Sequence, residues 1–149
     1  MTNEELTGLT QQWSLHYFHR PFTHTIFFNR RLKTTGGRYH LGDHHIDINP
    51  AMLTQFDEAT LKGVVFHELC HYHLHLSGQD YHHRSMAFKQ LLAQVGGARY
   101  APDTQPKRAM IWYECQTCRH RFTRARHFNV KRYRCARCGG KLREISPDL

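Results

Sequence analysis

The sequence predicts an α+β protein in two parts, and three observations predict it. Helical and strand-like periodicities alternate over the first hundred residues, an HExxH motif lies inside an apolar helical run, and two CxxC pairs stand near the C-terminus. We therefore expect an N-terminal helix, a small antiparallel sheet and two site-bearing helices, followed by a small four-cysteine zinc ribbon. The 149 residues can hold one core of about 100 residues and a small module that needs metal to fold.

The N-terminal elements are a helix and a sheet. Residues 2–19 open with a capping pattern at Thr2 and carry apolar side chains at helical spacing, at Leu6, Leu9, Trp13 and Tyr17. Residues 22–29 and 38–49 favour strands on either side of a turn at 34–37. An edge strand of this sheet beside a metal cleft would let a peptide bind by adding a strand.

The next predicted element is a long buried helix. Acidic residues Asp57 and Glu58 precede it, and Ser77-Gly78 supplies a stop signal. Apolar side chains occupy more than one of its faces, which indicates burial. The helix contains the HExxH motif, and Cys70 inside that motif is interpreted as a small buried apolar residue.

The HExxH motif is typical of zinc hydrolases. His67 and His71 stand at i and i+4, so on one helical face both can bind a single Zn²⁺. Glu68 points about 100° away, where a carboxylate reaches water activated by the metal rather than the metal itself. Because histidine is abundant, an accidental HExxH arises in about 5% of such sequences. Its place in a buried helix, where polar side chains need partners, favours the metal over solvated surface histidines.

A catalytic zinc needs a third protein ligand and an open position. His75 shares the face of the first two histidines, but two helical turns span about 12 Å, which is too far for a common ion. Residues 77–81 predict a turn, and a second helix follows with apolar side chains at Phe88, Leu91, Leu92 and Val95. His82 or His83, at its start, could complete the site, and spacing does not separate them. Leu74 occupies the glycine position of HExxHxxGxxH, which argues against a metzincin.

A second set of ligands lies near the C-terminus. Two CxxC pairs with sixteen intervening residues predict a structural zinc site of four thiolates, with the ligands Cys115, Cys118, Cys135 and Cys138. Two disulfides are the alternative, but no secretory leader or long apolar run is found. We therefore expect two zinc ions, one catalytic and one structural, in a soluble, cytoplasmic and monomeric protein.

Charge divides the chain at a proline-bearing segment. Residues 1–106 hold nine Lys and Arg and nine Asp and Glu, whereas residues 107–149 hold twelve against three. We predict domains at 1–100 and 108–149, joined by a linker at 101–107. Basic side chains between the cysteine pairs alternate with aromatic ones and suit single-stranded DNA, the basic set being Arg119, Arg121, Arg124, Arg126, Lys131, Arg132 and Arg134. The alternative is a solvated basic hairpin whose aromatic residues form the ribbon core.

Several segments together resemble the SprT-like (Spartan-related) zinc metalloprotease family with a C-terminal zinc ribbon. They are residues 37–41, 46–50, 67–76, 81–84 and 88–92, with the four late cysteines. The resemblance implies a zincin-like minimal metalloprotease core, and His83 rather than His82 as third ligand. Arg84 departs from the family, where glycine often follows that histidine. The family includes a DNA-dependent protease that removes crosslinked proteins from DNA, so single-stranded or damaged DNA is an expected partner.

The resulting hypothesis is peptide-bond hydrolysis with Glu68 as general base and zinc on His67, His71 and His83. The substrate would be a protein or peptide, and no membrane partner is expected. Two alternatives remain: a non-catalytic, zinc-containing nucleic-acid-binding adaptor, and hydrolysis of a non-peptide amide. The remaining histidines of the N-terminal part are interpreted as ordinary structural or surface residues, namely His16, His19, His24, His40, His44 and His45. The pair His44-His45 is a weaker candidate for an accessory metal site.

Overall fold

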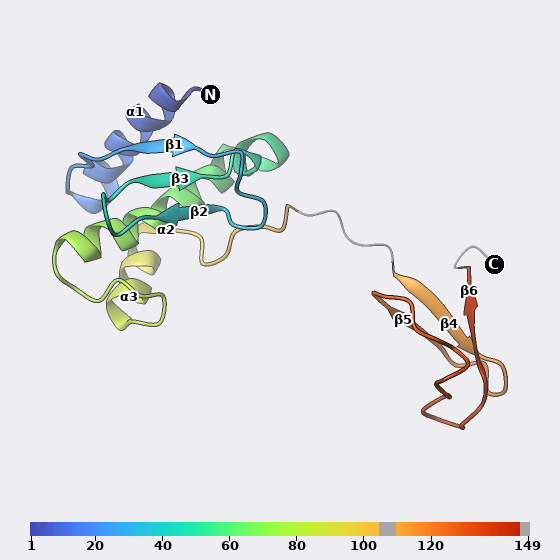
Figure 1. The fold of residues 1–149 in the computed structure, drawn as a ribbon. Coiled ribbons are helices and arrows are strands. Elements are labelled where there is room, and N and C mark those ends of the chain that lie inside the picture. The colour runs from blue at the N-terminus through green and yellow to red at the C-terminus, as the bar shows by residue number, and fades with distance from the viewer. Residues whose placement is uncertain (105–109, 147–149) are drawn as a thin grey trace. The chain divides into compact units, whose positions relative to one another are not determined.

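The computed structural model describes residues 1–104 and 110–146, which form an α+β protein as predicted (Figure 1). Two compact units are found, Met1–Gln105 and Pro106–Leu149. The predicted linker, residues 101–107, lies partly outside the described residues, as do both ends of the predicted ribbon, 108–149. Among the described helices, none is long and apolar enough to cross a membrane.

The chain begins with helix α1 (Asn3–Trp13), whose N-terminus is capped by Thr2. The Thr2 hydroxyl accepts a hydrogen bond from the Glu5 amide at 3.1 Å, as the capping pattern predicts. A wider π-helical turn, η1 (Ser14–Phe18), continues it and ends at His19 in the left-handed region, with φ of 58°. The helical prediction for residues 2–19 is therefore confirmed, with a change of winding near its end.

The N-terminal sheet contains β1 (Ile26–Phe28), β2 (Gly37–Tyr39) and β3 (Ile46–Ile48) in the order β1-β3-β2. Strand β2 runs antiparallel to β3, but β1 runs parallel to it. The prediction of an antiparallel sheet is therefore wrong for β1. Residues 38–49, expected to be extended throughout, form a hairpin because His44 adopts a φ of 63° and its amide bonds back to the His40 carbonyl.

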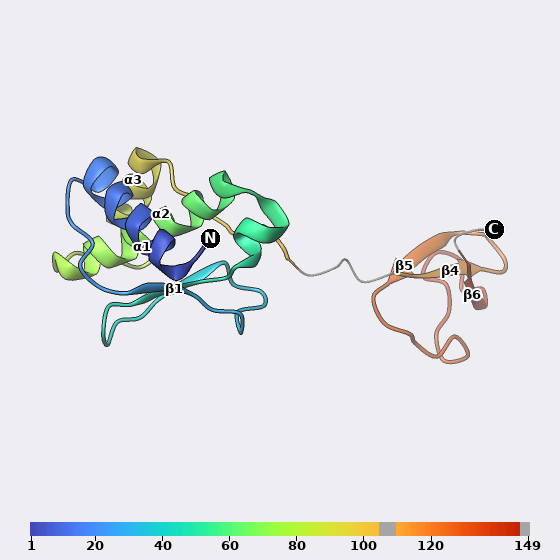
Figure 2. The ribbon, with the colours of Figure 1, turned by 90° about the horizontal axis from the view of Figure 1, so that it is seen from above.

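Helices cover one face of this sheet, as Figure 2 shows for α1, α2 and α3. Fully buried Ile46 and Ile48 of β3 belong to the core, and Asp47 between them points to the opposite face. A π-helical turn, η2 (Met52–Phe56), then leads to helix α2 (Glu58–Leu76). The arrangement places β2 at one edge of the sheet and α2 beneath it.

The boundaries of the two site-bearing helices follow the sequence signals. The Asp57 carboxylate accepts from the Thr60 amide at the start of α2, at 2.7 Å. Helix α3 (Met86–Val95) is capped by Ser85 and ends at Gly96, whose φ is 74°. Cys70 is fully buried, as predicted, and this burial raises the pKa of its thiol to about 12, so it remains a protonated apolar side chain.

The C-terminal unit is a three-stranded antiparallel sheet. Its strands are β4 (Ile111–Cys115), β5 (Arg121–Arg124) and β6 (Leu142–Ile145), in the order β5-β4-β6. Among the described residues its buried apolar cluster is small and consists of Cys115, Cys135 and Leu142. Two of these three side chains belong to the predicted zinc site.

Candidate metal centres

Three imidazoles meet at the floor of a cleft in the N-terminal unit. The Nε2 atoms of His67 and His71, on α2, each lie 2.9 Å from Nε2 of His83, in the loop before α3. Nitrogens so close together, with room for bonds of about 2.0–2.1 Å, fit a shared metal ion such as Zn²⁺. The structure therefore brings together the three histidines that the resemblance implied.

The neighbouring histidines do not join this cluster. His82 turns outward and pairs with Asp80, its Nδ1 lying 2.7 Å from the carboxylate. His75 instead has its Nδ1 2.6 Å from the Tyr39 hydroxyl. Loop geometry thus separates His82 from His83, which sequence spacing could not do.

Backbone carbonyls orient the two helical histidines. Nδ1 of His67 donates to the Ala98 carbonyl at 2.7 Å, and Nδ1 of His71 donates to the Tyr81 carbonyl at 2.5 Å. Each bond places the proton on Nδ1 and leaves Nε2 free to bind metal. Burial lowers the pKa of both rings, that of His71 to about 4, so both remain in the neutral form that binds metal.

Close packing around these rings was not predicted. Phe88 stacks on His71 with centroids 4.4 Å apart and also contacts the rings of His67 and His83. Gly97 allows the Ala98 segment to approach α2, because a Cβ there would lie 2.5 Å from Leu92 and 3.3 Å from Phe66. The helical spacing of apolar residues predicts only that Phe88 belongs to a hydrophobic core, not that it contacts the histidines.

Glu68 lies beside the cluster and is almost fully buried, with 6% of its surface exposed. Burial raises its pKa to about 8, and the nearby Asp47 carboxylate adds to the rise. Strand β2 passes directly over it: a Cβ on Gly37 would lie 3.1 Å from Glu68 Cγ and 2.9 Å from Ile48 Cδ1. Glycine at this position therefore permits the edge strand to approach the carboxylate.

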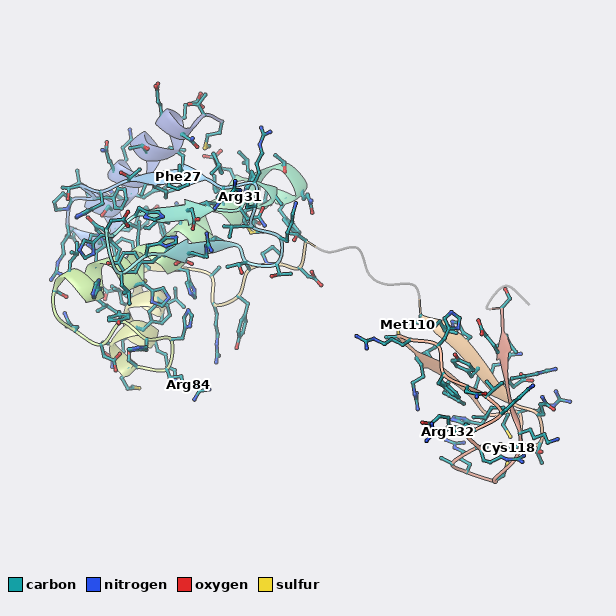
Figure 3. All side chains as sticks on the ribbon, viewed as in Figure 1. Phe27, Arg31, Arg84, Met110, Cys118 and Arg132 are labelled. Atoms are coloured by element: carbon teal, nitrogen blue, oxygen red, sulfur yellow. The ribbon has the colours of Figure 1, made fainter. Side chains whose placement is uncertain are left out.

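The surrounding cleft has a volume of about 750 Å³. It is lined by Glu68 and the two histidines of α2, by residues 34–41, which include edge strand β2, and by residues 81–83 and 98–101. Because β2 pairs with β3 along only one edge, its other edge is suited to pairing with an extended chain. The exposed side chain of Arg84 follows the third histidine at the molecular surface (Figure 3).

In the ribbon, the four predicted cysteines also converge. Sγ of Cys115 lies 3.4 Å from that of Cys138, and Sγ of Cys118 lies 3.7 Å from that of Cys135. Backbone amides, foremost that of Cys118, donate to the Cys115 sulfur and lower its pKa to about 6. Four free thiols whose sulfurs converge, with backbone amides donating to one of them, fit a zinc site with four cysteine ligands.

The two CxxC segments form equivalent turns. The amide of Arg119 bonds to the Cys115 carbonyl, and the amide of Gly139 bonds to the Cys135 carbonyl. Both turn residues have positive φ, 64° for Arg119 and 76° for Gly139. Cys118, labelled in Figure 3, belongs to the first turn.

The predicted basic side chains fall into two groups. Arg119 and Arg121 donate to the buried carboxylate of Glu114, at 3.3 and 2.9 Å, as does Arg143 from β6. Hydrogen bonds from Arg143 and Arg121 lower the pKa of Glu114 to about 2. These arginines therefore stabilise the ribbon sheet as well as contributing positive charge.

Most of the remaining basic side chains surround a ribbon cavity of about 750 Å³. Arg124, Arg126 and Arg134 line it with three aromatic rings and with side chains the sequence did not single out, namely His120, His127 and Arg137. Phe122 and Phe128 are half-buried against the cysteine cluster, whereas Tyr133 is 51% exposed. Lys131 and Arg132 are exposed nearby, and the Arg132 guanidinium lies 6.0 Å from the Tyr133 ring (Figure 3).

Comparisons with known proteins agree with this description. Residues 6–109 match the SprT-like family. The chain is 56% identical over 148 residues to Protein SprT-like of Lactiplantibacillus plantarum, covering 97% of this chain and all of that protein. It is 46% identical over 144 residues to Protein SprT-like of Enterococcus faecalis, covering 95% and 94% of the two chains. With a matching family domain, and with relatives that span nearly the whole chain, this protein belongs to the SprT-like family.

Proposed function

We propose that this protein is a zinc-dependent metallopeptidase of the SprT-like type. The observation that carries the proposal is the convergence of three Nε2 atoms beside buried Glu68, on the floor of a cleft bordered by edge strand β2. The donor set fits zinc because three imidazoles leave a fourth position for a substrate or solvent oxygen. When bound there, zinc would supply Lewis acidity that activates water and polarises a carbonyl.

The roles of the protein groups follow from their positions. His67, His71 and His83 would hold the ion, and β2 would align an extended peptide across the cleft. Glu68 would accept the proton of the attacking water and transfer it to the leaving amine. Burial raises the pKa of Glu68, and a cation held by the three histidines would oppose that rise, which suits a carboxyl that both accepts and releases a proton.

The test is a pair of substitutions with different expected effects on metal and activity. Glu68→Gln should retain zinc but lower cleavage of an unfolded protein substrate by roughly 10²–10⁴-fold, because the general base is lost. His67→Ala should lose both zinc from this site and cleavage. A fully active Glu68→Gln variant would contradict this mechanism. A wild-type chain that binds zinc at this site but cleaves no substrate would favour the adaptor with a structural zinc. Cleavage of small amides without cleavage of peptides would favour the non-peptide hydrolase.

We further propose that the ribbon binds single-stranded nucleic acid. Its cavity combines exposed Tyr133 with the guanidinium groups of Arg124, Arg126 and Arg134. Basic groups can neutralise phosphates, and an exposed ring can stack on an unpaired base. The positive charge of the C-terminal segment adds a longer-range attraction.

This second proposal predicts separable effects on affinity and salt dependence. In the full-length chain, Tyr133→Ala should weaken binding of a single-stranded oligonucleotide by about 1–3 kcal/mol. Arg134→Ala should weaken binding and lower the salt slope by about 1. Arg30→Ala removes the same charge from an exposed position of the N-terminal unit and serves as control. Binding that is equal at low and high salt would contradict the proposal.

A further inference from the structure

A side-chain hydrogen bond ties edge strand β2 to the metal-bearing helix α2. The Tyr39 hydroxyl lies 2.6 Å from Nδ1 of His75, in the last turn of α2. The same hydroxyl lies 2.7 Å from Nδ1 of His44, in the connection between β2 and β3. A phenol can donate one hydrogen bond and accept another, so it can bond to both rings at once. His75, which is too distant to share the zinc of the other two helical histidines, is thus engaged with the edge strand.

The strand pairing shows which backbone groups of β2 face its free edge. The His40 amide bonds to the His45 carbonyl at 2.9 Å, just beyond the paired strands. Hydrogen-bonded pairs alternate along an antiparallel ladder, so Arg38 also bonds towards β3. The backbone amides and carbonyls of Gly37 and Tyr39 therefore point to the free edge, where an added peptide strand would pair.

Both of these residues are held against α2. A Cβ on Gly37 would lie 3.1 Å from Glu68 Cγ, so the backbone approaches the helix closely there. Tyr39 lies on the same face two residues later, and its ring packs edge-on against fully buried Tyr72, with centroids 6.0 Å apart. Burial raises the pKa of Tyr39 to about 12, so the hydroxyl keeps its proton for hydrogen bonding. The residues whose backbone would bind a peptide are thus the ones that α2 fixes.

His75 also contacts the loop that supports the second histidine of the cleft. The Tyr81 ring packs edge-on against the His75 ring, with centroids 4.8 Å apart. The Tyr81 carbonyl in turn accepts the hydrogen bond from Nδ1 of His71, which lies one helical turn before His75. One imidazole therefore contacts both the strand that would align a peptide and the loop that orients a metal ligand.

We propose that Tyr39 and His75 are positioning residues that hold β2 at the distance from α2 at which a paired peptide meets the metal site. The proposal rests on the peptidase function proposed above. Helix α2 carries Glu68 and two of the three histidines, so a strand fixed to α2 is fixed relative to the reacting groups. Because the strand is ordered before the peptide arrives, little of the pairing energy is spent on ordering it.

The test is the kinetics of the zinc-loaded full-length chain on a peptide long enough to pair along β2. Tyr39→Phe and His75→Leu should each lower kcat/KM about tenfold, because one hydrogen bond is lost. The loss should appear as a higher KM, since part of the pairing energy is then spent on ordering β2. A variant that merely contains less folded protein would instead lower kcat and keep KM.

Two further variants separate this role from general packing. His75→Asn should restore most of the lost affinity, because its amide can both donate to and accept from the Tyr39 hydroxyl. Tyr17→Phe is the matched control, since the Tyr17 hydroxyl accepts from Lys62 Nζ at 2.9 Å but does not line the cleft. Its KM should match that of the wild type. Equal KM values in the wild type, Tyr39→Phe and His75→Leu would overturn the proposal and leave the peptidase proposal untouched.

A second measurement requires no cleavage. In zinc-loaded Glu68→Gln protein, an extended peptide should shift the amide NMR signal of Gly37, and adding Tyr39→Phe should raise the peptide Kd about tenfold. An unmoved Gly37 signal, or an equal Kd with and without Tyr39→Phe, would overturn the positioning role. The expected difference in Kd, found in a protein whose wild type cleaves no peptide, would support that role and count against the peptidase proposal alone.

Discussion

The two units of the chain hold their metal-ligand clusters in different ways. In the N-terminal unit, the histidines extend from a helix that packs in a cluster of 18 buried apolar side chains, and the cluster contains none of those histidines. In the ribbon, the buried apolar cluster among the described residues has three members, and Cys115 and Cys135 are two of them. The N-terminal core can therefore form without an ion, whereas the ribbon core contains the ligands themselves.

Metal removal gives the largest expected difference between the units. A chelator should unfold the ribbon, because structural zinc contributes about 10–16 kcal/mol to folding in such small modules. The N-terminal unit should keep its folded amide signals, since its core lacks ligands. Two-dimensional amide NMR of the full chain, before chelation and after zinc is restored, checks this expectation. Cooperative loss of both sets of signals would remove the distinction.

Phe88 is the side chain that links the N-terminal core to the histidine cluster. Phe88→Ala should lower the free energy of unfolding by about 3–5 kcal/mol, because Phe88 is only 2% exposed. Zinc affinity should fall too, since the ring contacts all three histidines. Phe56→Ala, at a position 40% exposed, is the control for denaturant unfolding. Equal losses in the two variants would contradict this role.

Gly37 tests how closely the edge strand must approach Glu68. Gly37→Ala should cost about 1–3 kcal/mol of stability, because its Cβ would meet Ile48 at 2.9 Å. Peptide cleavage should fall further than stability, because displaced β2 lines the cleft. Gly42→Ala, in the adjacent turn, adds a Cβ with no atom within 4 Å and should preserve both properties. Unfolding curves and cleavage rates of the two variants provide the comparison.

The smallest expected effect is a pH dependence from Asp47. Burial alone would raise its pKa, but hydrogen bonds from Arg38, Asn29 and His40 outweigh burial and hold it at about 2, below the ordinary 3.8. A lowered pKa stabilises the fold above about pH 4, and this contribution is lost as the pH falls through about 2. In metal-free protein, Asp47→Asn should flatten the stability profile between about pH 2 and 5. If stability falls equally with pH in the wild type and in the variant, the lowered pKa of Asp47 is contradicted.

Local patterns predicted the features that depend on short sequence separation. The start of α2 at Asp57, the HExxH spacing and the two CxxC turns are set by neighbours within a few residues, so the sequence was enough to place them. The Ala98 carbonyl that accepts from His67 lies 31 residues away in the sequence, and no local sequence pattern predicts this hydrogen bond. The parallel pairing of β1 with β3 likewise depends on how distant segments meet.

The hydrogen bonds of the ribbon arginines were likewise not predictable from local sequence patterns. Charge alternation marked Arg119 and Arg121 as nucleic-acid contacts, yet both bond to Glu114. Register explains the meeting, since Glu114 on the central strand lies opposite Arg121 on one side and Arg143 on the other. Composition gives the number of positive charges, whereas strand pairing decides which of them also bond within the sheet.

The support of His67 by Ala98 affects where the chain can be shortened. Beyond Ala98, the Ala101 methyl packs where Gly36 leaves space, and the Thr104 hydroxyl donates to the Lys33 carbonyl at 2.6 Å. A fragment ending at residue 100, the predicted domain boundary, would keep the three histidines of the cleft. It would lose the packing of Ala101 and the hydrogen bond of Thr104. Work on the isolated N-terminal unit should therefore retain the chain through Thr104, so that the segment whose Ala98 carbonyl supports His67 stays in place.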